Sequence, residues 1–222
     1  MKQLVAALLA VPVLCAVSGA QAQSAGSWQY KAGVNTITPK VTSGDLSAPS
    51  LPGTKIDVKA ATSLIISATY MYTDNISVEA YAGLPYKHDI EGAGAIAGAG
   101  NLGTVSQVSP TVFGQYRFGS SSSAFRPYVG LGLTYAYFYG EEGSGTLTAL
   151  TNPGGPPTTS STDAAFGLSP QLGATYSLRD KWYLEATLVK TYLKTTTSLS
   201  TGQSIDIKLD PVSFNFAIGQ RF

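Results

Sequence analysis

Apolar residues alternate with small or polar residues along several long segments of this sequence, and this period of two residues is the strongest constraint on its fold. From Tyr128 to Tyr139, one set of alternate positions is apolar or aromatic and the other set is mostly small. The segment from Phe166 to Leu178 repeats the pattern. Such alternation is typical of β-strands that separate two environments. A soluble barrel would bury its apolar set, whereas here the small and polar set suits the interior, so we expect the apolar side chains to face outward.

Composition narrows the fold and function classes further. Charged residues make up only 12% of the 222 residues, against about 25% in ordinary soluble domains. The sequence has 24 Gly and 13 Tyr but 2 Met, which favours strands and turns over helices. This argues against a helical bundle, an α/β enzyme and a disordered chain. The formal net charge of +1 offers no basic field for a phosphate backbone, so we expect no nucleic-acid partner.

The N-terminal segment is typical of an export signal. The apolar run from Leu4 to Val17 is 14 residues long, shorter than the span of about 20 that a membrane helix needs. Small residues follow it and end in an A-x-A site at Ala22, so we predict that residues 1–22 are a cleaved secretory signal peptide. The mature chain, residues 23–222, is expected to form a single domain without a thiol, because Cys15 lies within the signal.

The lengths of the connections between strands indicate a bacterial outer-membrane barrel. Three connections are tight, at 73–75, 119–125 and 179–181, and those between them are longer, notably 87–104 and 141–163. Short turns on one side and long loops on the other are typical of these barrels. We therefore predict an all-β fold, an eight-stranded antiparallel transmembrane β-barrel with up-and-down meander topology, whose tight turns face the periplasm. The eight strand-like segments are Trp28 to Val41, Ser63 to Thr73, Ile76 to Tyr86, Val105 to Phe118, Arg126 to Gly140, Ala164 to Leu178, Trp182 to Thr195 and Ser204 to Phe222.

Aromatic residues gather at the ends of these segments, as expected for belts at two membrane interfaces. The periplasmic group is Trp28, Tyr30, Tyr70, Tyr72, Tyr116, Phe118, Tyr176, Trp182 and Phe222, and the group on the loop side is Tyr86, Tyr137, Tyr139, Phe166 and Tyr192. In the last segment Phe214, Phe216, Ile218 and Phe222 share one face. This terminal strand looks like the signal read by the barrel assembly machinery, which we predict as a partner.

A series of short motifs runs through the predicted mature chain in a fixed order and spacing. They are Lys31-Ala32-Gly33-Val34, Thr38-Pro39, Thr69-Tyr70-Met71-Tyr72-Thr73-Asp74-Asn75-Ile76, Pro85-Tyr86-Lys87-His88-Asp89-Ile90, Gln115-Tyr116-Arg117-Phe118, Arg126-Pro127-Tyr128-Val129-Gly130, Lys208-Leu209-Asp210-Pro211 and Ile218-Gly219-Gln220-Arg221-Phe222. Together these motifs resemble the outer membrane protein W (OmpW) family, which includes the alkane-uptake porin. The resemblance implies an eight-stranded barrel with a narrow, largely hydrophobic lumen, associated with passage of small hydrophobic molecules and embedded in outer-membrane lipids.

The alternation also assigns side chains to the lumen, which an eight-stranded barrel leaves just wide enough for side chains to fill. Near the periplasmic end we expect a charged floor, either a structural ion-pair cluster or a plug against solutes or both, made of Lys31, Glu79, Arg117, Glu185 and Arg221. Above it we expect an apolar lumen lined by Ile37, Ile65, Tyr81, Phe113, Phe138 and Val189. A hydrophobic solute that enters such a lumen would have to leave sideways into the bilayer.

Two prolines in neighbouring predicted strands suggest where a solute could leave. Pro85 and Pro110 lie at similar heights above the tight turns, and a proline cannot donate to the ladder of hydrogen bonds between strands. They are therefore candidates for a lateral gate, although both could simply mark where strands fray into loops.

Two other classes of function compete with passive hydrophobic uptake. An enzyme would need a general base or an activated nucleophile, and the chain offers the single histidine His88 beside Asp89 without an assigned nucleophile. We predict no enzyme, no cofactor and no metal site, because carboxylates are scattered and no cysteine remains in the mature chain. A surface receptor, adhesion or structural protein acting through its long loops remains the alternative to passive hydrophobic uptake.

Overall fold

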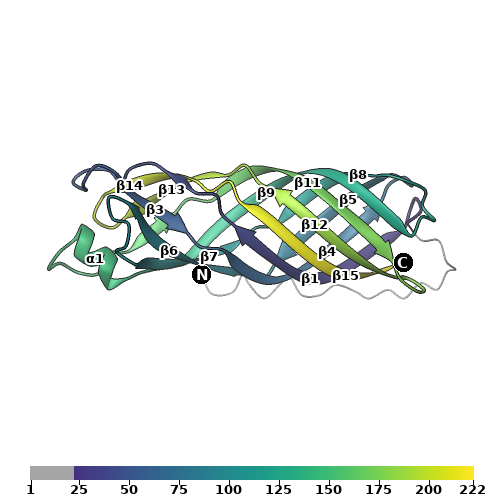
Figure 1. Cartoon of the computed structure of the whole chain (residues 1–222), viewed down its shortest axis with the longest axis horizontal. Helices are drawn as coiled ribbons and strands as arrows, with labels where there is room; N and C mark the ends of the chain where they lie inside the picture. The colour runs from purple at the N-terminus through teal and green to yellow at the C-terminus, as the bar shows by residue number, and fades with distance from the viewer. Residues whose placement is uncertain (1–22) are drawn as a thin grey trace.

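A computed structural model of the chain describes residues 23–222, which form one long tube of β-strands (Figure 1). The predicted signal peptide, residues 1–22, lies outside the described residues. At the end of the tube that carries the tight turns, eight strands close into a barrel, here called the membrane barrel. They confirm the predicted eight-stranded antiparallel fold. These strands are β1 (Trp28–Thr38), β4 (Ala61–Met71), β5 (Ile76–Gly83), β8 (Thr111–Arg117), β9 (Phe125–Gly143), β11 (Ala165–Ser177), β12 (Trp182–Lys190) and β15 (Val212–Arg221).

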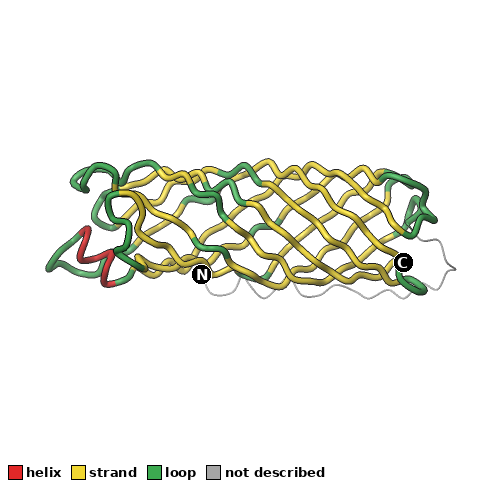
Figure 2. The backbone as a smooth tube through the Cα atoms, in the orientation of Figure 1, coloured by secondary structure: helices red, strands yellow, loops and turns green. Residues whose placement is uncertain are grey.

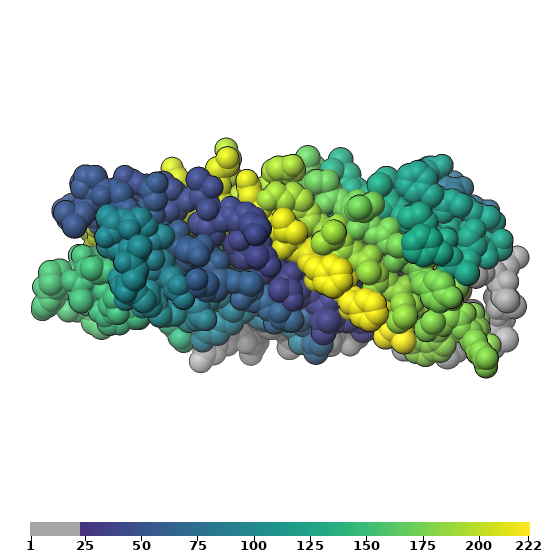
Figure 3. Space-filling model, in the orientation of Figure 1, coloured from purple at the N-terminus to yellow at the C-terminus, as the bar shows by residue number. Residues whose placement is uncertain are grey.

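The first and last strands close the barrel. Around the wall the strands follow one another in chain order, and β15 pairs antiparallel with β1 over 10 residue pairs, from Gln29 opposite Arg221 to Thr38 opposite Val212. Figure 3 shows the last strand in yellow lying beside the first in purple. This part of the sheet therefore has no free edge, which a barrel in lipid requires.

Beyond the membrane barrel the tube continues as an extension, on the side away from the tight turns (Figure 2). Two short sheets build it, β3–β6–β7 joined to the upper half of β9, and β10–β13–β14–β2. The connections 87–104 and 141–163, predicted as loops, thus contribute strands as well as turns. The extension comprises β2 (Thr42–Ser43), β3 (Thr54–Val58), β6 (Tyr86–Gly94), β7 (Asn101–Val108), β10 (Ser160–Thr162), β13 (Lys194–Leu199), β14 (Ser204–Lys208) and the helix α1 (Gly145–Thr151).

Prolines mark the junction between the membrane barrel and the extension. Pro39 follows β1, Pro85 lies between β5 and β6, Pro110 lies between β7 and β8, and Pro211 precedes β15. Each interrupts what would otherwise be one continuous strand, because proline has no backbone N–H to donate. Within residues 23–222, no helix is long and apolar enough to cross a membrane.

The two faces of the wall are as the alternation predicts. On β9, Val129, Leu131 and Leu133 are exposed on the outside, whereas Tyr128 and Thr134 are buried inside. The outer face is apolar, as a wall in lipid requires, and the inner face carries polar side chains together with buried rings such as Tyr128.

Tyr86 is an exception, because the prediction that it joins the loop-side aromatic belt is wrong. Its ring is buried inside the tube, beside the space that a Cβ on Gly83 would occupy, and its hydroxyl accepts a 2.9 Å hydrogen bond from Asn35 Nδ2. The exposed pair Leu84 and Pro85 shifts the alternation by one position between β5 and β6. A shift of one residue turns every following side chain to the other face.

Candidate functional site

The five charged residues predicted for the floor all lie inside the membrane barrel, one on each of five strands. Lys31 comes from β1, Glu79 from β5, Arg117 from β8, Glu185 from β12 and Arg221 from β15. Each residue is at most 4% exposed. The tight turns bring these residues toward the same end of the tube, and the alternation turns their side chains into its interior.

Lys31 lies between the two carboxylates. Its Nζ is 2.7 Å from Glu79 Oε1 and also forms an ion pair with Glu185 Oε1. All three side chains are at most 1% exposed. Buried charges are stable only when they are paired and hydrogen-bonded, and Lys31 thus ties β1 to strands on both sides of it around the wall.

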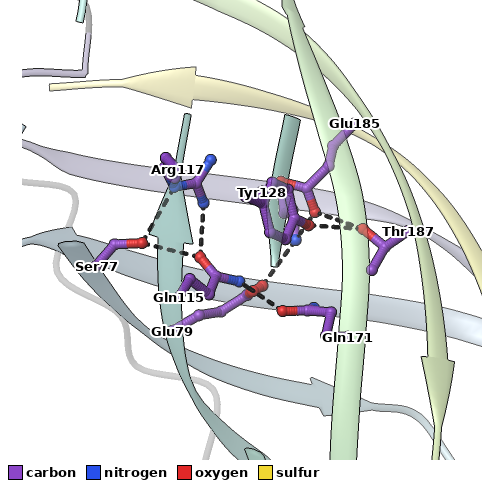
Figure 4. A network of polar contacts seen from close by, with 9 residues as sticks. Ser77, Glu79, Gln115, Arg117, Tyr128, Gln171, Glu185 and Thr187 are labelled. Carbon is purple, nitrogen blue, oxygen red and sulfur yellow. Dashed lines mark hydrogen bonds and ion pairs between the residues drawn. The ribbon is translucent and has the colours of Figure 1, made fainter. Parts of the chain in front are cut away.

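Amides extend this ion-pair group across the lumen (Figure 4). Gln115 Nε2 donates to Glu79 Oε2 at 2.5 Å and to Gln171 Oε1 at 2.9 Å. The Gln115 Oε1 atom accepts from Arg117 Nη2 at 2.8 Å and from the Ser77 hydroxyl at 2.9 Å. These contacts therefore form a connected network of polar groups from several strands.

Arg117 is held by an aromatic ring in place of a carboxylate. Its guanidinium carbon lies 4.6 Å from the centre of the Tyr128 ring, directly across the strand pair. On the far side, Gly173 faces the ring so closely that a Cβ there would lie 2.4 Å from Tyr128 Cζ. Among residues 23–222, Arg117 forms no ion pair, so the cation–π contact and the hydrogen bonds stabilise its charge.

Arg221 repeats the arrangement. Its guanidinium carbon lies 4.6 Å from the centre of the Tyr183 ring, and Gly219 leaves space for that ring, with a 2.4 Å distance from an added Cβ to Tyr183 Cζ. Arg221 Nη1 also donates to the Ser177 hydroxyl at 2.9 Å. Neither tyrosine was among the predicted site residues, although an inward glycine opposite an inward tyrosine on the next strand could have indicated both stacks.

The six predicted apolar lumen residues face inward but do not form one layer. Ile37 and Ile65 belong to a buried cluster with Tyr86, against which Tyr81 packs. Phe138 belongs to a separate cluster in the extension. The Phe113 ring meets the Tyr81 ring edge-on at 6.4 Å, and Val189 is buried on β12. Polar residues such as Asn35 and Gln107 lie among them.

The extension encloses an apolar cavity of about 140 Å³, which we call the chamber. Of the predicted apolar residues, Ile37 and Phe138 line it. An engineered apolar cavity of about 150 Å³ in another protein stays dry and binds benzene, so the chamber matches a small hydrocarbon in size. Most of its aliphatic lining comes from segments above the predicted lumen and includes Leu46, Ile56, Ile90, Val105, Leu193, Ile205, Ile207 and Leu209.

The two prolines predicted as a lateral gate lie where pairing between neighbouring strands is interrupted. The β5–β8 pairing ends with Tyr81 opposite Thr111, and the β6–β7 pairing starts again with Tyr86 opposite Gln107. Between these pairs lie Pro85 and Pro110. Neither is among the residues that line the chamber, whereas Pro39 and Pro211 are.

His88 lines the chamber and is buried. Its Nδ1 is 2.7 Å from the Lys59 carbonyl oxygen, which can only accept, so Nδ1 carries the proton and Nε2 is left as an acceptor. Nε2 has no hydrogen-bond partner within residues 23–222. Burial lowers the pKa of His88 below its ordinary value, which favours a neutral imidazole beside the apolar lining.

The residues predicted as an assembly signal lie on the lipid-facing side of β15. Phe214, Phe216, Ile218 and Phe222 are all exposed. Their role in assembly stays a prediction.

Comparison with known proteins gives matches over the whole described chain. A profile of the OmpW family matches residues 24–222. Outer membrane protein W of Vibrio cholerae serotype O1 is 34% identical over 230 residues, covering 100% of both chains. The dibenzothiophene metabolism operon protein PahQ of Pseudomonas aeruginosa is 26% identical, covering 96% of this chain and 97% of its own length. The crystal structure of OprG from Pseudomonas aeruginosa superposes with a TM-score of 0.81 at 27% identity, covering 91% of this chain and 98% of OprG.

Replacing either floor carboxylate should destabilise the barrel. Glu79→Ala or Glu185→Ala leaves Lys31 short of one partner, and breaking a buried ion pair costs about 3 to 5 kcal/mol in reference proteins. We expect a lower unfolding midpoint in denaturant, or leakier ion conductance in planar bilayers. Glu142→Ala is the matched control, because its pair with Lys87 is solvent-exposed and such pairs contribute about 0.2 to 1 kcal/mol. Stability and conductance equal to the control would refute a floor at this position.

The protein should lose stability below neutral pH through its single histidine. Because the pKa of His88 is lowered by folding, the unfolded chain binds a proton more readily, with a pKa of about 6.5. Its contribution is therefore complete above that pH and is lost as the pH falls, by at most about 1.4 kcal/mol per pH unit. Urea unfolding at pH 8 and pH 5 should show a larger drop for wild type than for His88→Gln. Equal drops would mean that His88 is solvated.

Proposed function

The chain belongs to the OmpW family and is a β-barrel of the bacterial outer membrane, and from that premise we propose that it mediates passive uptake of small hydrophobic molecules. The observation that carries the proposal is the apolar chamber of about 140 Å³ in the extracellular extension. Its place at the outer end of the tube is where a solute arriving from outside would first leave water.

The chamber favours apolar solutes over polar ones for a physical reason. Transfer of apolar surface from water into such a lining gains about 25 cal/mol for each Å² buried. A sugar would gain little, because its hydroxyls would lose water without finding enough partners. Aliphatic side chains such as Ile56, Ile90 and Ile207 supply the lining. The chamber would therefore select solutes by their size and by how favourably they partition from water into an apolar environment.

The charged layer below supports a sideways exit in preference to a straight path. A hydrophobic solute moving toward the periplasm would have to displace hydrogen-bonded groups around Lys31, Glu79 and Gln115. The interrupted pairing beside Pro85 and Pro110 offers a shorter path through the wall into the bilayer. The name of the relative PahQ, which refers to metabolism of an aromatic hydrophobic compound, agrees with a solute of this class.

Making the chamber polar should slow hydrophobic uptake. Ile56→Gln with Ile90→Gln places amides on the lining at two partly buried positions, which lowers the partition of an apolar tracer. In vesicles carrying equal amounts of folded protein, we expect about a tenfold loss for a double substitution worth about 1.4 kcal/mol. Thr42→Gln, on the outer surface of β2, is the control. Efficient passage of small sugars through the wild type, or unchanged tracer uptake in the double variant, would contradict the proposal.

Restoring backbone donors at the interruption should close the exit. Pro85→Val with Pro110→Val supplies two N–H groups that can pair across the wall. We expect slower transfer of hydrophobic tracer into the bilayer while the folded fraction on an unheated gel stays unchanged. Pro39→Val with Pro211→Val tests the other junction. If the first variant transfers tracer as wild type does, or if only the second variant loses transfer, the exit does not lie at Pro85 and Pro110. The proposal that solutes enter through the chamber would stand in either case.

A further inference from the structure

Four lysines form a basic patch on the outer surface at the junction of the membrane barrel and the extension. We propose that this patch, Lys40, Lys190, Lys194 and Lys208, binds the phosphate groups of anionic lipid headgroups in the outer leaflet. The inference concerns the outside of the wall and does not depend on what passes through the chamber.

Strand register brings the lysines together. Lys194 on β13 is directly opposite Lys208 on β14, and Lys208 is opposite Thr42 on β2. The Lys40 backbone N–H donates to the Leu209 carbonyl at 2.8 Å, which places Lys40 next to the same strand. Like charges directly opposite each other on a sheet are destabilising. None of the four lysines forms an ion pair within the described part of the chain, so the repulsion calls for an external anion.

Carboxylates near the patch are engaged with other groups. Asp206 Oδ1 accepts a 2.7 Å hydrogen bond from the Thr196 hydroxyl. Asp210 Oδ1 accepts a 3.0 Å hydrogen bond from the Leu193 N–H, and Lys190 Nζ donates to the Asp210 main-chain oxygen, not to its carboxylate. Within residues 23–222 neither carboxylate forms an ion pair with the four lysines, so their ammonium groups keep donors available for a ligand.

Lysines on the other wall of the extension are neutralised internally. Lys55 pairs with Asp45 at 3.9 Å. Lys59 Nζ lies 2.8 Å from Glu91 Oε2, and Lys87 Nζ lies 3.6 Å from Glu142 Oε2. Each of these three lysines has an acidic partner, whereas none of the four lysines of the patch has one within the described residues. The patch is therefore distinguished by its unpaired charge and not by the number of its lysines.

The height of the patch fits a headgroup layer. Below it, Leu188 on β12 and Phe214 on β15 are paired and exposed on the lipid face. Above them Tyr192 exposes its ring, with Lys190 Nζ 5.8 Å from the ring centre, as expected for an aromatic residue at a membrane interface. Lys194 comes two residues later along the chain. Basic residues at this depth attract anionic headgroups, and a phosphate matches lysine as a compact charge.

The test measures binding of lipid A to folded protein in detergent by native mass spectrometry, with bisphosphorylated and dephosphorylated lipid A in separate arms. Each lysine near an anionic lipid surface raises the binding affinity by about a factor of five. Lys194→Gln with Lys208→Gln should therefore weaken the affinity for phosphorylated lipid A about 25-fold. Lys59→Gln with Lys87→Gln is the matched control and should bind as wild type does. Lys194→Arg with Lys208→Arg keeps the charges and should retain binding.

Folding of each variant is checked by its migration on an unheated gel. Equal binding by the glutamine variant and wild type would overturn the proposal, as would equal binding of phosphorylated and dephosphorylated lipid. Full competition by millimolar inorganic phosphate would show a site for free anions and would also reject the lipid assignment.

Discussion

Closure of the wall is the constraint on which the rest of this structure depends. A strand in lipid cannot leave backbone N–H and C=O groups unpaired, so the sheet must have no edge within the membrane. Pairing of β1 with β15 over 10 residue pairs meets that requirement. Once the wall is closed, each strand has one face in lipid and one in a narrow lumen, and the period of two fixes which side chains occupy each.

The narrow lumen then decides how charge can be stored inside it. Eight strands leave space for side chains and little else, so every buried charge needs a partner contributed by another strand. Lys31 finds two carboxylates, whereas the guanidinium of Arg117 rests on the ring of Tyr128 and that ring on Gly173. Small inward residues such as Gly173 leave the space that these rings and charges occupy.

Sequence reasoning reached the features that follow from alternation within one strand. The alternation predicted the eight barrel strands, the closed antiparallel barrel that they form and the inward orientation of residues such as Glu79 and Glu185. Contacts between strands also depend on register, which no single segment of the sequence encodes. The alternation turns Tyr128 and Gly173 inward, but only the register sets them opposite each other. Strand β14 and part of β7 fall inside segments predicted as barrel strands, Ser204 to Phe222 and Val105 to Phe118. Strands β3 and β10 and most of β6 lie in connections predicted as loops, because residues rich in Gly, Pro and Ser surround them in the sequence.

Two matched shifts in the inside–outside alternation keep charged side chains of β3 and β6 out of the chamber. Along β5 the inward positions include Glu79 and Tyr81, and an uninterrupted period of two would carry Lys87 and Asp89 into the chamber. The exposed pair Leu84 and Pro85 moves the alternation by one, so His88 and Ile90 line the chamber instead. The segment that joins β3 to β4 makes the same shift at 59–60, since Val58 lines the chamber and Ala61 is buried in the membrane barrel. Because the two shifts are matched, β3 and β6 can pair above the junction with apolar side chains facing in. The interruption of the ladder is thus tied to the polarity of the chamber, because a chain without it would place the charges of Lys87 and Asp89 in the apolar lining.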